Sequence, residues 1–163
     1  MSELLGNFNF VVTLDPGDAY LPPAQARLVP LVAVGAFQEV KGLGADLEVV
    51  AYAEGGVNDH VHQLPVRHTW SRISLRHGVA RDSELWAWYQ AGLSGSLGAR
   101  RDGCVMLLTP AGVPAIAWVF RAGLAAKWQG PEFNAMQGAV ALEALDIAHE
   151  GLRQIPLGAP GVS

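Results

Sequence analysis

Two histidines stand two residues apart in the segment Asp59-His60-Val61-His62. Side chains two residues apart on an extended strand point to the same side, so both imidazoles could reach one metal ion, with His68 as a third nitrogen ligand. No carboxylate at a defined spacing completes such a site, and a solvated loop rich in histidine is the simpler interpretation. A small metal-dependent β-barrel enzyme that uses His60 and His62 therefore stays an alternative function.

The adjacent residues His149 and Glu150 could act as a general acid and a general base. If the segment is a strand, however, neighbouring side chains point to opposite faces and do not readily share one substrate. The pair therefore favours a histidine packed in a sheet and an exposed glutamate.

Other reactive residue types lack the pattern that their chemistry needs. The clusters 42–44 and 92–98 are rich in glycine, but neither has the spacing of a dinucleotide-binding loop, and no P-loop motif is present. Ser94 and Ser96 stand outside a Gly-x-Ser-x-Gly nucleophile motif. We therefore assign no catalytic residue, no metal ligand and no cofactor.

The five tryptophans could stack on sugars or bases, as in a carbohydrate- or ligand-binding sandwich. Their positions within periodic segments favour packing in the core or in an interface instead. A ligand-binding module is therefore a second alternative.

The bulk composition indicates one domain that covers part of its surface with other chains. The chain has 163 residues, of which 50% are hydrophobic and 16% are charged. So few charges leave little polar surface, which favours burial against partners. The formal net charge of −4 gives no indication of a nucleic-acid partner, which would want a basic face.

The compartment expected from the sequence is the cytoplasm. Cys104 is the single cysteine, so no intrachain disulfide can form. The N-terminus has no basic segment followed by an apolar run, as a signal peptide would, and the apolar run 28–37 is too short to span a bilayer. We expect the chain to be made and folded in the cytoplasm, without membrane insertion.

Alternating patterns predict a chain of short strands with one helix near the middle. The helix is expected at 82–93, where Asp82 or Ser83 can cap the first turn, and a polar loop is expected at 57–68. The fold class is therefore mainly β, a β-rich α+β domain of antiparallel sandwich or barrel type with one flanking helix. The predicted strands are 7–14, 31–40, 46–54, 69–78, 104–109 and 115–120.

The closing run, 139–152, is ambiguous from its local pattern. Its Ala, Leu and Glu content favours a helix. A period of two fits no worse, since it places Glu143, Leu145, Ile147 and His149 on one face. Helix and strand both stay open on this evidence.

A series of short strings is more specific than the composition. Together they cover most of the chain, from about Phe8 to Leu152, and the chain resembles the tail tube protein family of contractile phages and phage-like contractile injection systems, which includes Hcp-like inner tube subunits. The strings are Phe37–Leu43, Glu54–Gly56, Leu64–Pro65, Ile73–Gly78, Leu85–Trp88, Ala117–Phe120, Lys127–Pro131 and Leu142–Leu152, in that order.

The resemblance implies a structural protein without catalytic residues. Its subunits would close into hexameric rings that stack into a hollow tube inside a sheath, and the run 139–152 would be a strand. The implied partners are copies of the chain itself, the sheath protein, baseplate and tube-initiator or terminator proteins, and a cargo or tape-measure protein in the lumen. The particle would be a phage tail or an injection device, and a tube-initiating ring at the baseplate is the alternative within this class.

The resemblance also gives the expected domain layout. One tail-tube domain would span 1–163, with a proline-rich insertion at about 15–30 and a short C-terminal tail at 153–163.

A hairpin between 46–54 and 69–78 is predicted to face the lumen, while Leu47, Val49, Ile73 and Leu75 pack inward on the helix. The predicted lumen-facing residues are Asp46, Glu48, Arg72, Ser74 and Arg76. The predicted contacts with a neighbouring ring or the sheath are Tyr20, Arg27, Asn58, Asp59 and His60.

Overall fold

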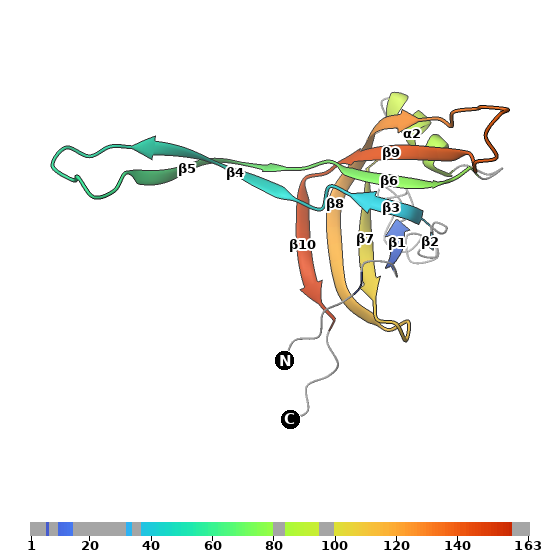
Figure 1. Cartoon of the computed structure of the whole chain (residues 1–163), viewed down its shortest axis with the longest axis horizontal. Helices are drawn as coiled ribbons and strands as arrows, with labels where there is room; N and C mark the ends of the chain where they lie inside the picture. The colour runs from blue at the N-terminus through green and yellow to red at the C-terminus, as the bar shows by residue number, and fades with distance from the viewer. Residues whose placement is uncertain are drawn as a thin grey trace.

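The structure is a computed structural model that describes residues 6, 10–14, 32–33, 37–79, 84–94 and 100–157. These residues form antiparallel strands and one helix, α2 (Glu84–Leu93), so the predicted mainly β fold class is confirmed (Figure 1). The strands are β1 (Phe10–Leu14), β2 (Val32–Ala33), β3 (Phe37–Lys41), β4 (Ala45–Tyr52), β5 (His62–Trp70), β6 (Ile73–Gly78), β7 (Arg101–Leu108), β8 (Pro114–Gln129), β9 (Leu142–Ala148) and β10 (Gly151–Pro156).

The long strand β8 connects two parts of the main sheet. Its first half pairs with β7 and β10, and its second half pairs with β9. The order β2-β1-β7-β8-β9-β6-β3 therefore turns at β8, where Ala122 has a φ of 52°. A Cβ on the next residue, Gly123, would lie 2.7 Å from the Phe120 ring, so glycine lets the two sheet halves approach closely at this bend.

The substitution Ala122→Gly is expected to stabilise the fold. Left-handed backbone strain costs alanine about 1–2 kcal/mol, and glycine avoids this strain. Glycine loses more conformational entropy on folding, which costs about 0.5–1 kcal/mol. The free energy of unfolding should therefore rise by about 0.5 kcal/mol. The midpoint of urea unfolding should rise with an unchanged slope. The control Ala117→Gly, in a regular part of β8, should lower the midpoint, and a fall for Ala122→Gly as well would contradict this account.

The core lies between the two parts of the bent sheet. Leu85 and Trp88 insert into it from α2 and are 0% and 1% exposed. Removing these apolar side chains from water supplies the main driving force for folding. The other buried core residues are Val12, Leu14, Phe37, Ile73, Leu75, Val105, Phe120, Ala125, Leu145 and Ile147.

The closing run is a strand, as the resemblance implied, and not a helix. β9 pairs with β6 on one side and with β8 on the other, so backbone pairing on both edges overrides its helical composition. Glu143, Leu145 and Ile147 are all buried, which confirms that they share one face. The chain turns at 149–150 and continues as β10.

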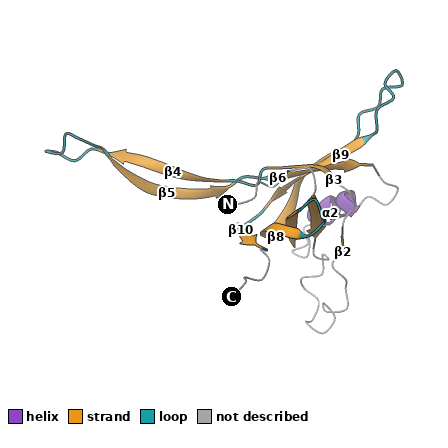
Figure 2. Ribbon diagram, turned by 60° about the horizontal axis from the view of Figure 1, so that its bottom comes forward, coloured by secondary structure: helices purple, strands orange, loops and turns teal. Residues whose placement is uncertain are grey.

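Strands β4 and β5 form a separate two-stranded sheet that projects far from the rest of the domain (Figures 1 and 2). We call this element the hairpin. The predicted pairing of 46–54 with 69–78 is therefore wrong: β4 pairs with β5, and 69–78 is divided at Ser71 and Arg72. Most of the expected loop at 57–68 belongs to β5.

The hairpin was mispredicted because neither of its faces is covered. Leu47 and Val49 are 50% and 45% exposed, so the expectation that they pack on the helix is wrong. Ile73 and Leu75 are 0% exposed, as expected. Pro65 in β5 argues against a central strand, but it lies beside the register shift near Val49 in an edge strand, where proline is tolerated.

The ends of the expected domain layout are only partly visible. β10 extends to Pro156 and pairs with β8, so residues 153–156 belong to the sheet rather than to a C-terminal tail. The insertion at 15–30, with Tyr20 and Arg27, lies outside the described residues, as do residues 158–163. No helix among the described residues is long and apolar enough to cross a membrane.

Candidate functional site

One face of the sheet formed by β3, β6, β9 and the second half of β8 is covered with charged and polar side chains. Successive side chains along these strands point to opposite faces of the sheet. Ile73 and Leu145 therefore lie in the core, while Ser74 and Asp146 are paired on the outer face. We call this outer face the charged sheet face. It holds a shallow depression of about 110 Å³, lined by Glu39, Lys41, Ser74, Arg76, Lys127, Gln129, Ala144 and Asp146.

Charges of both signs are interleaved on the charged sheet face. Glu39 forms ion pairs with Lys41 and with Arg76 Nη1, the latter at 3.4 Å. The hydrogen bond from Lys41, assisted by the charge of Arg76, holds the pKa of the Glu39 carboxyl below its usual range. A lowered folded-state pKa stabilises the fold above the usual carboxyl pKa, and this is lost as the pH falls through the lowered value. The pairs are largely solvated, so the effect is small.

The five predicted lumen-facing residues do not share one surface. Ser74 and Arg76 lie together on the charged sheet face. Asp46 and Glu48 lie on the hairpin, and the exposed Arg72 lies in the link between β5 and β6. The structure thus brings together two of the five residues.

Sequence reasoning missed the other charged residues of this face. Glu39 and Lys41 stand two residues apart, as do Lys127 and Gln129, and this spacing was the available signal. The pairing of Lys127 with Asp146 depends on the register between β8 and β9, which the local pattern does not contain.

The hairpin has one face without carboxylates and one face with them. Directly paired residues of antiparallel strands lie on the same side of the sheet. We call the first side the apolar hairpin face; it consists of Ala45, Leu47, Val49 and Ala51 with their partners Trp70, His68, Pro65 and Gln63. The opposite side carries Asp46, Glu48, Val50 and Tyr52 with Thr69, Arg67, Leu64 and His62.

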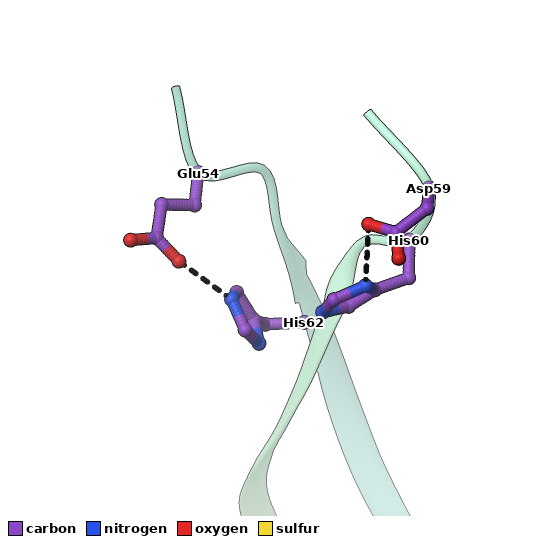
Figure 3. Close-up of polar contacts among 4 residues, drawn as sticks. All are labelled: Glu54, Asp59, His60 and His62. Carbon is purple, nitrogen blue, oxygen red and sulfur yellow. Dashed lines mark hydrogen bonds and ion pairs between the residues drawn. The ribbon is translucent and has the colours of Figure 1, made fainter. Parts of the chain in front are cut away.

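The histidines that could have bound a metal lie at the tip of the hairpin, each beside its own carboxylate (Figure 3). His62 Nε2 lies 2.8 Å from Glu54 Oε2, and His60 Nδ1 lies 3.0 Å from Asp59 Oδ1. The two imidazole rings meet edge to face, with centroids 5.0 Å apart. The tip is therefore two exposed polar pairs side by side.

A third ligand does not join these histidines. His68 packs against Trp70 at the opposite end of β5, with ring centroids 4.3 Å apart. Within the described part of the chain, no group of three or more His, Cys, Asp or Glu side chains is placed to hold a metal ion. Asn58, Asp59 and His60 are exposed at this tip, where a contact with another chain could form.

His149 and Glu150 are held apart by different partners. His149 Nε2 lies 3.0 Å from Ser71 O, and Glu150 accepts a hydrogen bond of 2.9 Å from Arg100. The histidine is half-buried and the glutamate is exposed, as expected, but both lie in the turn between β9 and β10 rather than on opposite faces of a strand. The histidine ties the turn after β9 to the root of the hairpin.

A buried acidic side chain, Glu143, links three strands of this sheet. Its side chain is 2% exposed; Oε1 lies 3.2 Å from His77 Nε2, and Oε2 accepts a hydrogen bond of 3.0 Å from Trp128 Nε1. Its place in phase with Leu145 and Ile147 was the signal that it points inward. The contact supports the charged sheet face from behind.

The profile of the T4-like virus tail tube protein gp19 family matches residues 6–153. A search of curated proteins found no match. Among solved structures, the fold is similar to a chain of the anti-feeding prophage baseplate, with a TM-score of 0.80 and 23% identity over 98% of this chain and 100% of that one.

Two further solved structures have a similar fold. A chain of the PVC sheath–tube complex, an extracellular contractile injection system in its extended state, gives a TM-score of 0.73 and 20% identity over 94% and 93% of the two chains. Hcp1 from Flavobacterium johnsoniae gives 0.51 and 13% over 90% and 94%. At these identities the likeness establishes the fold.

Proposed function

The chain belongs to the T4-like virus tail tube protein gp19 family and is a structural tube subunit, and we propose that its copies close into hexameric rings that stack into a hollow tube. The observation that carries this proposal is the four-stranded sheet with one apolar face, one charged face and two edges available for pairing. Such edges promote uncontrolled association unless a partner covers them, and closure of a ring removes them.

The strand directions favour closure by edge pairing. Within the described residues, β3 pairs only with β6, and residues 124–129 of β8 pair only with β9. Three antiparallel steps separate β8 from β3, so these two strands run in opposite directions. The second half of β8 in one copy can therefore continue the antiparallel order beside β3 of the next copy, and a closed ring repeats this contact.

We propose that the charged sheet face lines the lumen of this tube. A channel wall with interleaved charges stays hydrated and offers no apolar patch to which a passing chain would adhere. Lys41, Arg76 and Lys127 stand against Glu39 and Asp146, so neither sign dominates. Asp46, Glu48 and Arg72 remain proposed lumen residues near the root of the hairpin.

The other proposed partners follow from the tube. A sheath outside it, baseplate and terminator proteins at its ends, and a cargo or tape-measure protein inside it would each contact a different surface. The similar chains come from baseplate and sheath–tube structures, which supports this set. We propose that the tube assembles in the cytoplasm and that the subunit has no catalytic role. We also propose that the insertion at 15–30 and the hairpin tip contact neighbouring rings or the sheath.

The variant Arg76→Cys tests the lumen assignment. In purified tubes, this thiol should react with a small maleimide but several-fold more slowly with a polymer-linked maleimide, because the wall shields it from large reagents. Dissociated subunits of the same variant should react with both reagents, since the Arg76 side chain is 52% exposed in the single chain. Val113→Cys, on an exposed turn away from this sheet, is the matched surface control. Equal reactivity of the two variants in tubes would overturn the assignment.

A further inference from the structure

The loop between β8 and β9, residues 130–141, exposes large apolar side chains. Phe133 is 85% exposed, Met136 is 93% exposed and Val140 is 70% exposed. The loop is shaped locally by Asn134, whose side-chain Oδ1 accepts a hydrogen bond of 3.0 Å from the Met136 backbone. We call this segment the apolar loop. Exposed apolar clusters of this kind mark surfaces that other molecules cover.

The apolar loop and the hairpin project from opposite ends of the same sheet. The loop joins the end of β8 to the start of β9, while the hairpin joins the end of β3 to the start of β6. In the antiparallel order β8-β9-β6-β3 these two connections fall at opposite ends of the strands. Figures 1 and 2 show the hairpin at one end of the sheet and the loop after β8 at the other.

We infer that the apolar loop of one subunit docks on the apolar hairpin face of a second copy in the next ring. This inference rests on the proposed stacking of rings. A contact between two different surfaces is heterologous, so it repeats without closing and extends a tube. Both surfaces lie at the ends of a sheet whose edges are proposed to close the ring, so they remain available for the next ring.

The chemistry selects one of the two hairpin faces. The apolar hairpin face presents Leu47 and Val49, half exposed, and carries no carboxylate. The opposite face exposes large apolar side chains to a similar extent, but it also presents Asp46 and Glu48, which would lose hydration under an apolar loop. They would also repel Glu132, the single charged residue of the loop. The loop and the apolar hairpin face therefore match in polarity.

Cross-linking tests this contact directly. Leu47→Cys and Met136→Cys are combined in one chain and treated with a short bis-maleimide after assembly into tubes. Because each subunit then bridges to the next, denaturing gels should show a ladder of linked chains. Each single-cysteine variant serves as a negative control, because it also retains Cys104 and so reports any cross-link through that residue. Val50→Cys combined with Met136→Cys tests the opposite hairpin face. A ladder from the Val50 pair and none from the Leu47 pair would overturn the inference.

A second variant separates stacking from ring closure. Phe133→Ser with Met136→Ser should leave rings intact in negative-stain images but give shorter tubes. The association constant for adding one ring should fall about tenfold or more, which corresponds to a loss of about 1.4 kcal/mol or more at the ring–ring interface. Val113→Ser removes a similarly exposed apolar side chain elsewhere and should not change tube length. Unchanged tubes in the loop variant would overturn the inference alone. If the unaltered protein forms no rings, the proposed function fails as well.

Discussion

The substitution Gly42→Ala should lower the free energy of unfolding by about 2–5 kcal/mol, the sum of about 1–2 for left-handed strain and 1–3 for overpacking. Gly42 has a φ of +87°, and a Cβ on it would lie 1.8 Å from the backbone oxygen of Arg72. That oxygen belongs to the main chain and cannot rotate away. A single domain is stable by about 5–15 kcal/mol, so much of this stability would be lost.

Gly112→Ala is the matched control for this substitution. Gly112 has a φ of +81°, close to that of Gly42, but no heavy atom lies within 4 Å of the Cβ position. It should therefore show only the conformational strain, about 1–2 kcal/mol. Urea unfolding of the two variants measures the difference, which isolates the steric term. Equal losses would show that the contact with Arg72 relaxes freely and would contradict the argument.

The same contact has a consequence for assembly, because it lies at the root of the hairpin. The Ser71 backbone N–H donates to Gly44 O at 3.1 Å, and Ser71 O lies 3.0 Å from His149 Nε2. Together with the close approach at Gly42, these contacts hold in place the two segments of the chain that connect the main sheet to the hairpin. A variant that shifts them would redirect the hairpin and with it the proposed contact with the next ring.

Strands with one buried face were the predictable part of this fold. Ile73 and Leu75 alternate with Ser74 and Arg76, so their two faces could be assigned from the sequence. This is also why Ser74 and Arg76, of the five predicted lumen residues, fall on the charged sheet face.

The hairpin lacked this signal. β4 is exposed along its whole length, so no covered side imposed an alternating pattern. β4 pairs with β5 instead of β6, and the Gly42 turn lies against the Arg72 link at the base of this pair, a tertiary contact that the local pattern does not contain. The charged sheet face was incomplete for a related reason, because Lys127 and Asp146 meet only through strand register.

Glu143→Ala is expected to destabilise the subunit by about 2–6 kcal/mol, because His77 Nε2 and Trp128 Nε1 each lose a buried partner at a cost of about 1–3 kcal/mol. Glu143 is 2% exposed and His77 is 8% exposed, so water does not readily replace the lost contact. Trp128 Nε1 would lose its acceptor in the same substitution. Glu143→Gln keeps the size of the side chain and an acceptor oxygen for Trp128, so it should cost about 1–3 kcal/mol.

A double-mutant cycle distinguishes the specific contact between Glu143 and His77 from general packing. If Glu143 and His77 stabilise each other, His77→Ala combined with Glu143→Ala should cost less than the sum of the single changes by about 0.5–3 kcal/mol. Denaturant unfolding of the four proteins measures this coupling, and strictly additive losses would contradict it. The pair joins β6 to β9 beneath Arg76 and Ser74, and Trp128 joins β8 to them. Loss of the pair should therefore loosen the strands that carry the proposed lumen wall, and rings of Glu143→Ala should dissociate at lower denaturant than those of Glu143→Gln.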